Sequence, residues 1–383
     1  QRIYFDNAST TPMLPEVIDL MTGIMRHDFG NPSSIHQHGR RARAIIEEAR
    51  KKVARVINSS IGEVFFTGSA TEASNMTIKN AVTDLGVKRI IYAATEHHCV
   101  LHSIEHTVRH NNVHAVSLKI DSDGRPDLEE LDMLLAQSTI KTLVCLMHGN
   151  NETGTMNEIT EIGQLCKKYG ALYHCDTVQT LGKYPIDVQQ AHISFLTGSA
   201  HKFHGPKGTG FVFISHENII QPYIHGGSQE RNMRSGTENV AGIAGLAMAL
   251  EKSNEKMAEN FRYILTLRNE FKARLTETLP DIRFNGNQED KFLAHVLSVS
   301  FPPGPKAELL VMNLDIEGVS ASSGSACSSG VEEDSHVLQA IGHPHERKTI
   351  RFSFSPFNTL DEIGRTAGIL KKLLPAGDFK IQG

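Results

Sequence analysis

The sequence predicts an α/β protein in which a mostly parallel sheet, covered by helices on both faces, precedes a smaller α+β unit. The first indication is length, since 383 residues correspond to about two domains at roughly 150 residues each. The second is that short apolar runs alternate with helical patterns through the first two-thirds of the chain, as in parallel sheets. The third is that this order changes after Pro280.

The strands of the first part are predicted from short apolar runs that end at glycine or polar residues. Its helices are predicted from apolar side chains at helical spacing, as for Ile45, Ala49, Val53 and Val56. The predicted strands cover residues 63–67, 89–94, 114–120, 142–147, 171–175, 195–197 and 210–214. The predicted helices cover residues 41–57, a stretch from about 71, the region around 100, and residues 127–136, 158–169 and 237–279.

The smaller unit is predicted from the element order that follows Pro280. Strands are expected at 294–301, 317–321 and 349–354, with helices at 306–314 and at the end of the chain. A loop of small residues, 320–330, separates the last two strands. The sequence contains no internal repeat.

Composition excludes several classes of protein. Hydrophobic residues make up 39% and charged residues 21% of the chain, which is ordinary globular usage. The formal net charge of −4 favours neither nucleic acid nor an anionic membrane surface. We find no secretory signal and no apolar stretch of the ~18–20 residues that span a bilayer. The odd number of cysteines, 5, with no Cys-x-x-Cys pair, indicates reduced thiols in a cytoplasmic protein.

Polar residues follow several predicted strands, where ligands bind in open α/β sheets. Residues 68–72 (GSATE) lead from a strand into a helix, and the N–H groups of a helix N-terminus favour a phosphate. Thr71 could equally be only the N-cap of that helix. Asp176 closes another strand, where its carboxylate could hold a cationic ring nitrogen, and Gln179 could donate to a nearby phenolic oxygen. Asp176 could also simply cap the following turn.

Lys202 lies among small residues after a third strand. A lysine in this position can form a Schiff base with an aldehyde cofactor, and the flanking Ser199 and His201 could hold the phosphate of that cofactor. A nucleotide P-loop is disfavoured because the Gly-Lys-Ser/Thr ending is missing.

His97 follows a fourth strand. Its planar ring could stack on a flat cofactor and move protons. The competing interpretation is a metal site, but His97, His98 and Cys99 are consecutive, whereas helical zinc ligands share one face of a helix. We therefore expect no metal.

Together these motifs resemble those of the class V aminotransferase-fold enzymes, and among them the NifS/IscS-type cysteine desulfurases. They occur in family order across almost the whole chain: 6–12 (DNASTTP), 29–34 (FGNPSS), 68–72 (GSATE), 95–97 (TEH), 150–154 (NNETG), 174–179 (HCDTVQ), 199–202 (SAHK), 226–231 (GGSQER), 233–237 (MRSGT) and 322–327 (SSGSAC). The resemblance implies the pyridoxal-phosphate-dependent transferase fold, which is aspartate aminotransferase-like and called fold type I. Residues 15–260 would form the large cofactor-binding domain, and residues 1–14 with 261–383 the small one.

The resemblance also implies a set of cofactor-binding residues. Lys202 would carry pyridoxal 5′-phosphate, Asp176 would pair with its ring nitrogen, and His97 would stack on the ring and serve in proton transfer. The remaining ring and phosphate contacts would come from Ala70, Thr71, Asn151, Gln179, Ser199, His201 and, in the neighbouring subunit of a homodimer, Thr237.

The implied reaction converts L-cysteine to L-alanine and leaves a persulfide on Cys327, the cysteine of the small-residue loop. Arg351 would bind the substrate carboxylate, because a guanidinium suits bidentate binding, and Asn31 would assist. The other four cysteines, including Cys99, are predicted to be small core residues. A sulfur-acceptor protein, such as an iron–sulfur scaffold or a tRNA-thiolation protein, would take the sulfur.

Other functions remain open from the sequence. A selenocysteine lyase or a cysteine-sulfinate lyase would use nearly the same site on the same fold. A zinc-dependent hydrolase and a non-catalytic binding module are the alternatives from other classes, and metal analysis with visible absorbance would separate them from a pyridoxal enzyme.

Overall fold

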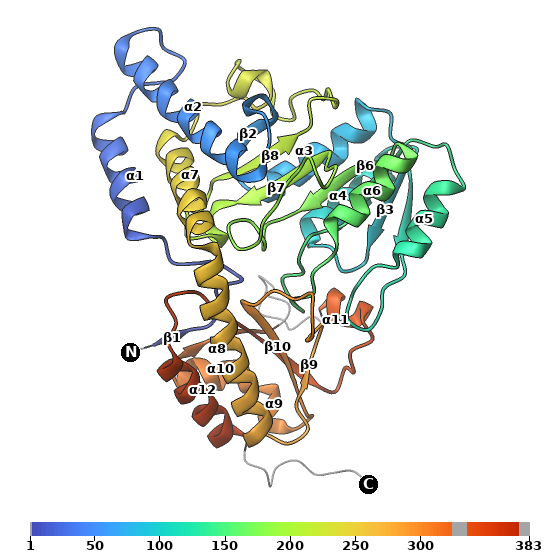
Figure 1. Ribbon diagram of the computed structural model, residues 1–383, viewed down its shortest axis with the longest axis vertical. Coiled ribbons are helices and arrows are strands. Elements are labelled where there is room, and N and C mark those ends of the chain that lie inside the picture. The colour runs from blue at the N-terminus through green and yellow to red at the C-terminus, as the bar shows by residue number, and fades with distance from the viewer. Residues whose placement is uncertain (1, 324–334, 375–383) are drawn as a thin grey trace.

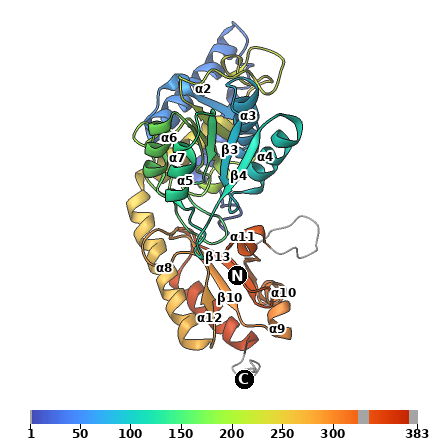
Figure 2. The ribbon, with the colours of Figure 1, turned by 90° about the vertical axis from the view of Figure 1, so that its right-hand side faces the viewer.

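The computed structural model describes residues 2–323 and 335–374. Its described part forms two bodies, each with its own sheet, and helices α7 and α8 run from one body to the other (Figure 1). The view turned by 90° shows the same division, with the large sheet above and the small sheet below (Figure 2).

The upper body is built on a seven-stranded sheet with strand order β2-β8-β7-β6-β5-β3-β4. Only the pairs made by β8 are antiparallel, so the sheet is mostly parallel, as predicted. Several strands are buried along their whole length, because helices cover both faces. The strands are β2 (Val64–Thr67), β3 (Arg89–Ala93), β4 (His114–Leu118), β5 (Thr142–Cys145), β6 (Leu172–Asp176), β7 (Phe195–Ser199) and β8 (Gly210–Ile214).

Apolar helix faces pack on each side of this sheet. On one side α2, α5, α6 and α7 contribute Val53, Leu131, Ile162 and Leu246 to one hydrophobic cluster. On the other side α3 and α4 contribute to a second cluster. The helices of this body are α1 (Pro15–His27), α2 (Gln37–Ile57), α3 (Ala70–Thr83), α4 (His98–His110), α5 (Leu128–Ala136), α6 (Ile159–Tyr169) and α7 (Val240–Glu255), with short 3₁₀ turns η1 (Ile61–Glu63), η2 (Ala200–Lys202) and η3 (Glu230–Asn232).

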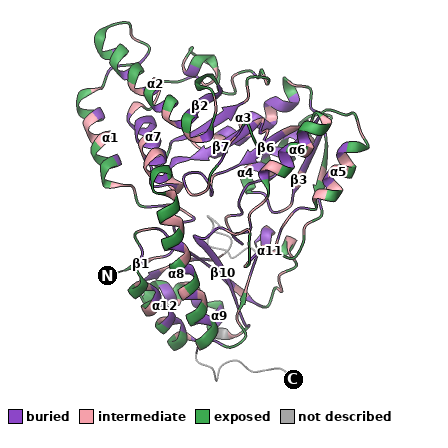
Figure 3. Ribbon diagram, viewed as in Figure 1, coloured by how far each residue is buried: buried purple, intermediate pink, exposed green. Residues whose placement is uncertain are grey.

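The lower body has a four-stranded antiparallel sheet with strand order β12-β13-β10-β9. Its core is a separate hydrophobic cluster that includes Phe271 and Phe352, and also Ile3 and Phe5 from the N-terminal segment. The strands of both bodies are mostly buried, whereas the outer helices carry many of the exposed residues (Figure 3). The strands are β9 (Arg283–Phe284), β10 (Val296–Phe301), β12 (Ser322–Ser323) and β13 (Lys348–Ser353), and the pair β1 (Ile3–Tyr4) and β11 (Val319–Ser320) is parallel. The helices are α8 (Met257–Thr278), α9 (Pro305–Glu308), α10 (Leu310–Ile316), α11 (His336–Ala340) and α12 (Leu360–Leu373).

Several elements differ from the prediction: the sequence did not predict α1, α11 or β9, and the expected helix at 306–314 is two helices, α9 and α10. The single helical pattern across residues 237–279 is two helices, α7 and α8, which meet at Lys256 with φ −98° and ψ 8°. The sequence before this break, Ser253-Asn254, has low helix propensity. Each helix buries its apolar residues in a different body, Leu250 in the upper one and Leu267 in the lower one. Periodicity alone does not reveal a change of packing partner.

Candidate active site

A cavity of about 360 Å³ opens beside the carboxyl ends of the large sheet's strands. Strands β2, β3, β5, β6 and β7 all run in one direction, so their carboxyl ends meet at this edge. The structure thereby brings ten of the predicted site residues to one cavity. They are Ala70, Thr71, His97, Asn151, Asp176, Gln179, Ser199, His201, Lys202 and Arg351.

Lys202 ends the 3₁₀ turn that follows β7. Its Nζ donates to the carbonyl oxygens of Ala8 at 2.6 Å and Ser9 at 2.8 Å. Burial, followed by the positive charge of Arg351, lowers the pKa of Lys202 to about 8, although Asp6 and Asp176 oppose the shift. A much larger fraction of this amine is therefore neutral near pH 7 than for an exposed lysine, and the neutral amine is the nucleophilic form.

Asp176 is the last residue of β6, and only 7% of it is exposed. Its Oδ1 accepts from the backbone N–H of Val178 at 2.9 Å, so it does cap the turn, as the alternative interpretation expected, while it also lines the cavity. Burial raises the pKa of Asp176 to about 6, and Lys202 moderates the rise. The side chain is thus mostly an anion at neutral pH. A cationic group of a ligand beside it would lower its pKa and stabilise the anion.

The first turn of α3 forms one end of the cavity. The N-cap of this helix is Ser69, whose side chain accepts from the Glu72 N–H, so the interpretation of Thr71 as the N-cap is wrong. Thr71 is exposed and lines the cavity together with Ala70. The negative charge of Glu72 in this turn is paired with Arg234, whose Nε lies 2.9 Å from the Glu72 Oε1. This end of the cavity is consequently suited to an anion.

His97 is exposed toward the cavity and is the N-cap of α4. Its Nδ1 accepts from the backbone N–H of Cys99 at 3.1 Å, which leaves Nε2 as the protonated nitrogen of the neutral ring. The enclosing walls and then the charge of Lys202 lower the pKa of His97 to about 4. At neutral pH this ring is uncharged, flat and able to donate a hydrogen bond.

Arg351, on β13, is 3% exposed and is therefore not a surface arginine. Its Nη2 lies 3.0 Å from the Asp6 Oδ1 and 2.6 Å from the Ser9 Oγ, and its Nη1 donates to the Asn151 carbonyl at 2.9 Å. The Nε is buried with no hydrogen-bond partner among the described residues. Arg351 thus brings a fixed guanidinium from the lower body into a cavity of the upper body.

Two predicted residues lie elsewhere, and a third is not described. Asn31 is exposed in the loop between α1 and α2, where its Oδ1 accepts from the Ser33 N–H, and it does not line this cavity. Thr237, which the resemblance places in a neighbouring subunit's site, is exposed and does not line the cavity of its own chain. Cys327 lies outside the described residues.

The structure adds residues that sequence reasoning missed. Glu152 lines the cavity beside Asn151 and accepts a hydrogen bond from the Ser335 hydroxyl, although the motif at 150–154 had drawn attention only to Asn151. His336 lines the cavity as well. Cys99 is only half-buried and lines the cavity, with its Sγ 3.8 Å from the Ser74 Oγ, so it is not the core residue that was predicted. The predicted burial of Cys145, Cys166 and Cys175 is confirmed.

Glu152 predicts a pH-dependent change in stability. Burial raises the pKa of Glu152 to about 7, against the opposing effects of Ser335 and Arg351. The folded protein therefore keeps this proton where the unfolded chain loses it, and stability falls as pH rises from about 4.5 to about 7. Glu152→Gln removes this titration. The free energy of unfolding of the variant minus that of the parent should therefore increase by up to about 3 kcal/mol as pH rises across that range. Urea denaturation at pH 5 and pH 8 measures the gain.

The matched control is Glu158→Gln, which changes an exposed carboxylate six residues further along the chain. Its free energy of unfolding, relative to the parent, should be the same at both pH values. If the difference between Glu152→Gln and the parent were also the same at both pH values, the raised pKa of Glu152 would be contradicted.

Comparison with known proteins agrees with this geometry. The family model for aminotransferase class-V matches residues 3–365, so the chain belongs to the class V aminotransferase family. Within it, the chain is 39% identical over 378 residues to the cysteine desulfurase IscS of Dictyoglomus turgidum, covering 98% of this chain and 95% of that protein. It is 38% identical over 377 residues to the cysteine desulfurase IscS of Methanosarcina thermophila, covering 97% and 92%. A solved structure described as a NifS-like protein superposes with a TM-score of 0.90 at 34% identity, covering 97% of this chain and 99% of that one.

Enzymes of this family depend on pyridoxal phosphate, and the cavity has the groups to hold it. A buried lysine with a lowered pKa, a buried aspartate and the N-terminus of α3 line the same 360 Å³ space. The backbone at the phosphate end is close-packed, since a Cβ on Gly210 would lie 2.8 Å from the Ser69 carbonyl carbon. Lysine for the aldehyde, carboxylate for the ring nitrogen and helix N–H groups for the phosphate are the donor set this cofactor requires.

Proposed function

We propose that the protein is a cysteine desulfurase. In the balanced reaction, L-cysteine and the thiol of Cys327 give L-alanine and a persulfide on Cys327. The observation that carries the proposal is one cavity in which Lys202, Asp176 and Arg351 meet. These residues supply an amine and a buried anion for the cofactor, and a buried cation for the carboxylate of an amino-acid substrate. Incubation of the protein with L-cysteine should yield alanine and add the mass of one sulfur atom to Cys327; cysteine consumption without alanine would contradict the proposal.

The bound cofactor would supply an electron sink for the bond changes at the substrate. Asp176 would hold the protonated ring nitrogen through its carboxylate, and His97 would lie against the ring. Asn151 and Gln179 would contact the ring substituents. The phosphate would be held by the first turn of α3 and its neighbours: Ala70, Thr71, Ser199 and His201, with Thr237 of the second subunit.

Lys202 would transfer protons to and from the substrate. The Nζ of a lysine with a pKa near 8 can accept a proton from carbon and return it at neutral pH. The carbonyl groups of Ala8 and Ser9, which accept its hydrogen bonds, keep the amine at the cavity wall.

Arg351 would bind the substrate carboxylate. Arg351→Lys should raise the KM for L-cysteine roughly 10- to 100-fold with a smaller change in kcat, because a bidentate charge-assisted pair is lost while a positive charge remains for Asp6. Steady-state kinetics give both constants. Arg283→Lys, an exposed arginine of the same sheet, is the control and should match the parent; an unchanged KM in Arg351→Lys would remove Arg351 from the substrate site.

The placement of Cys327 is supported by the described residues on either side of it. Ser322, in β12, pairs with Arg351 in the sheet. On the other side, Ser335 binds Glu152, and the His336 Nε2 lies 2.9 Å from the Glu96 carbonyl oxygen. The described residues before and after Cys327 in the sequence therefore both lie beside the cavity.

A thiol substrate fits the charges of the cavity better than a sulfinate does. Lys202 and Arg351 are the only lysine and arginine among its described lining residues, and both have roles with the cofactor and the carboxylate. The pKa values of His97 and His201 are lowered to about 4, chiefly by burial, so these rings carry no charge at neutral pH. A second substrate anion would therefore find no further lysine or arginine among the described lining residues. The described residues contain no group of three His, Cys, Asp or Glu side chains placed to hold a metal ion.

The proposal includes the organisation of the protein. Residues 15–260 would form the cofactor-binding domain, and residues 1–14 with 261–383 the small domain, which the separate hydrophobic clusters support. The enzyme would be a cytoplasmic homodimer that passes sulfur to an acceptor protein, such as an iron–sulfur scaffold or a tRNA-thiolation protein. No helix of the described chain is long and apolar enough to cross a membrane.

A further inference from the structure

The side chain of Gln179 is held between the cavity and the lower body. It is 4% exposed, and its Nε2 donates to the Ala8 carbonyl at 3.0 Å. Its Oε1 lies 3.1 Å from the Nε2 of His295, a residue that immediately precedes β10. The Nζ of Lys183 donates to the main-chain carbonyl of Gln179 at 3.2 Å. The side-chain amide of Gln179 is thus held by Ala8, which also lines the cavity, and by His295, while Lys183 holds its main-chain carbonyl.

These contacts determine which nitrogen of His295 carries the proton. A carbonyl oxygen accepts only, so the amide atom that faces Ala8 must be the nitrogen, and the atom that faces His295 is the oxygen. The His295 Nε2 must then be the donor, and the ring is the Nε2–H tautomer when neutral.

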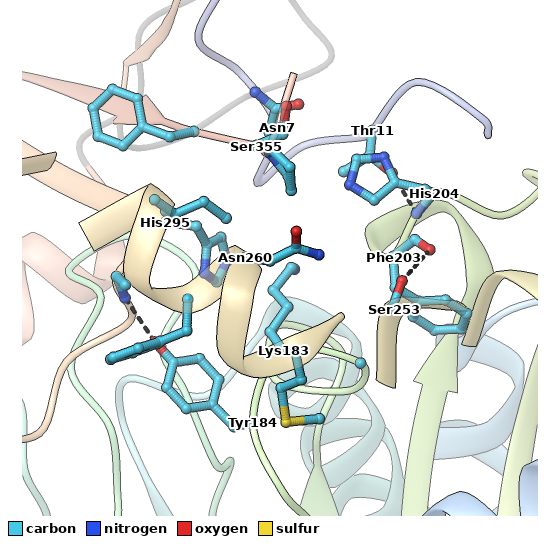
Figure 4. Close-up of a pocket in the computed structure, with 17 residues that line it drawn as sticks. Asn7, Thr11, Lys183, Tyr184, Phe203, His204, Ser253, Asn260, His295 and Ser355 are labelled. Carbon is cyan, nitrogen blue, oxygen red and sulfur yellow. Dashed lines mark hydrogen bonds between the residues drawn. The ribbon is translucent and has the colours of Figure 1, made fainter. Parts of the chain in front are cut away.

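The surroundings keep this ring neutral. His295 is 2% exposed, and burial, followed by the positive charges of Lys183, Arg351 and Lys202, holds its pKa well below the usual value. Figure 4 shows His295 and Lys183 at the wall of a second, small cavity, which has a volume of about 40 Å³ and no carboxylate among its described lining residues. Nothing at this wall favours the charged imidazole.

We propose that His295 is a positioning residue: its Nε2–H holds the Gln179 amide so that the NH₂ group faces the cofactor. An amide nitrogen has two hydrogens; Ala8 takes one, and the other remains for an oxygen on the cofactor ring. Without His295 only the Ala8 carbonyl would hold the amide, and its second N–H would no longer be fixed toward the ring oxygen. This inference rests on the proposed function, because it gives Gln179 its cofactor contact.

The tautomer can be tested directly on the holoenzyme. Protein labelled with ¹⁵N-histidine should show one ring, absent from the spectrum of His295→Gln, that is protonated at Nε2 and does not titrate between pH 6 and 8. A His295 ring protonated at Nδ1, or one that titrates in this range, would overturn the proposal without any variant having to bind the cofactor.

The cofactor provides the second test. Relative to the parent, His295→Leu should weaken pyridoxal-phosphate binding roughly tenfold and raise by about one unit the pH at which the bound chromophore titrates, as expected for one lost hydrogen bond to a charged oxygen. His295→Gln, which keeps a donor near the Nε2 position, should restore part of both changes. Because His295 acts through Gln179, the double variant His295→Leu/Gln179→Leu should match Gln179→Leu alone. Additive effects, or a His295→Leu variant equal to the parent, would contradict the proposal.

The control is Tyr184→Phe. The Tyr184 hydroxyl accepts from the backbone N–H of Ala294 at 2.7 Å (Figure 4), so this variant disturbs the residue next to His295 and leaves the ring in place. Its chromophore should titrate as in the parent, whereas a shift as large as that of His295→Leu would make the effect structural and overturn the proposal. A parent protein that takes up no pyridoxal phosphate would instead refute the proposed function, while the ¹⁵N test of His295 would still stand.

Discussion

Lys202→Ala should abolish covalent attachment of pyridoxal phosphate and lower the turnover of L-cysteine by at least about 10³-fold, because one side chain provides both the attachment point and the proton-transfer group. Its Nζ lies within 2.8 Å of two main-chain carbonyls at the cavity wall, and its pKa is lowered to about 8 by burial and by Arg351. Borohydride reduction followed by peptide mass spectrometry locates the cofactor, and alanine formation gives the turnover.

The control for this experiment is Lys207→Ala. Lys207 is an exposed lysine five residues beyond Lys202, so its removal changes the net charge equally and should leave attachment and turnover unchanged. Finding the reduced cofactor on another lysine of the Lys202→Ala protein would move the attachment site and reject the assignment.

Cys327→Ala should keep the bound cofactor and its visible absorbance but form no persulfide, so that sulfur release with a physiological thiol falls to background. The reason is chemical: the cofactor is held by residues of the described cavity, whereas the sulfur atom needs a thiolate to receive it. Absorbance spectra and mass spectrometry after addition of L-cysteine measure the two properties separately. Full sulfur release by the variant would reject Cys327 as the acceptor.

Cys99 is the thiol that has to be compared with Cys327, since it lines the cavity itself. Burial, followed by the negative charge of Asp176, raises the pKa of Cys99 to about 12, so this residue is a neutral thiol and a poor nucleophile at pH 7 to 8. Cys99→Ser should therefore retain persulfide formation on Cys327. If Cys99→Ser formed no persulfide while Cys327→Ala still did, Cys99 and not Cys327 would be the residue that accepts the sulfur.

Much of the cofactor site could be predicted because its residues follow strands. Asp176, Ser199, Lys202 and His97 come at or shortly after the carboxyl ends of apolar runs, and parallel strands bring such positions to one edge. Two predictions about helix ends were wrong. The N-cap of α3 is Ser69 and not Thr71, and one helical pattern became α7 and α8, because capping and helix breaks depend on backbone angles and packing partners.

Other site residues could not be found from sequence, because their roles come from contacts across long separations. Glu152 meets Ser335, and Gln179 meets His295; no spacing rule connects such pairs. Their burial then shifts the pKa of Glu152 to about 7 and that of His295 downward, and desolvation of this kind exists only in the folded chain.

The sequence by itself determined the α/β class, the order of the strands along the chain and the residue types that pyridoxal chemistry needs, since hydrophobic periodicity and local motifs are properties of neighbouring residues. The tertiary structure alone decided which of these residues share a cavity, that Arg351 enters it from the lower body beside Asp6, and that Lys202 is buried enough to lose much of its charge. The physical reason is that distance and solvent exclusion, which govern charge and proton transfer, are set by packing between segments far apart in the chain.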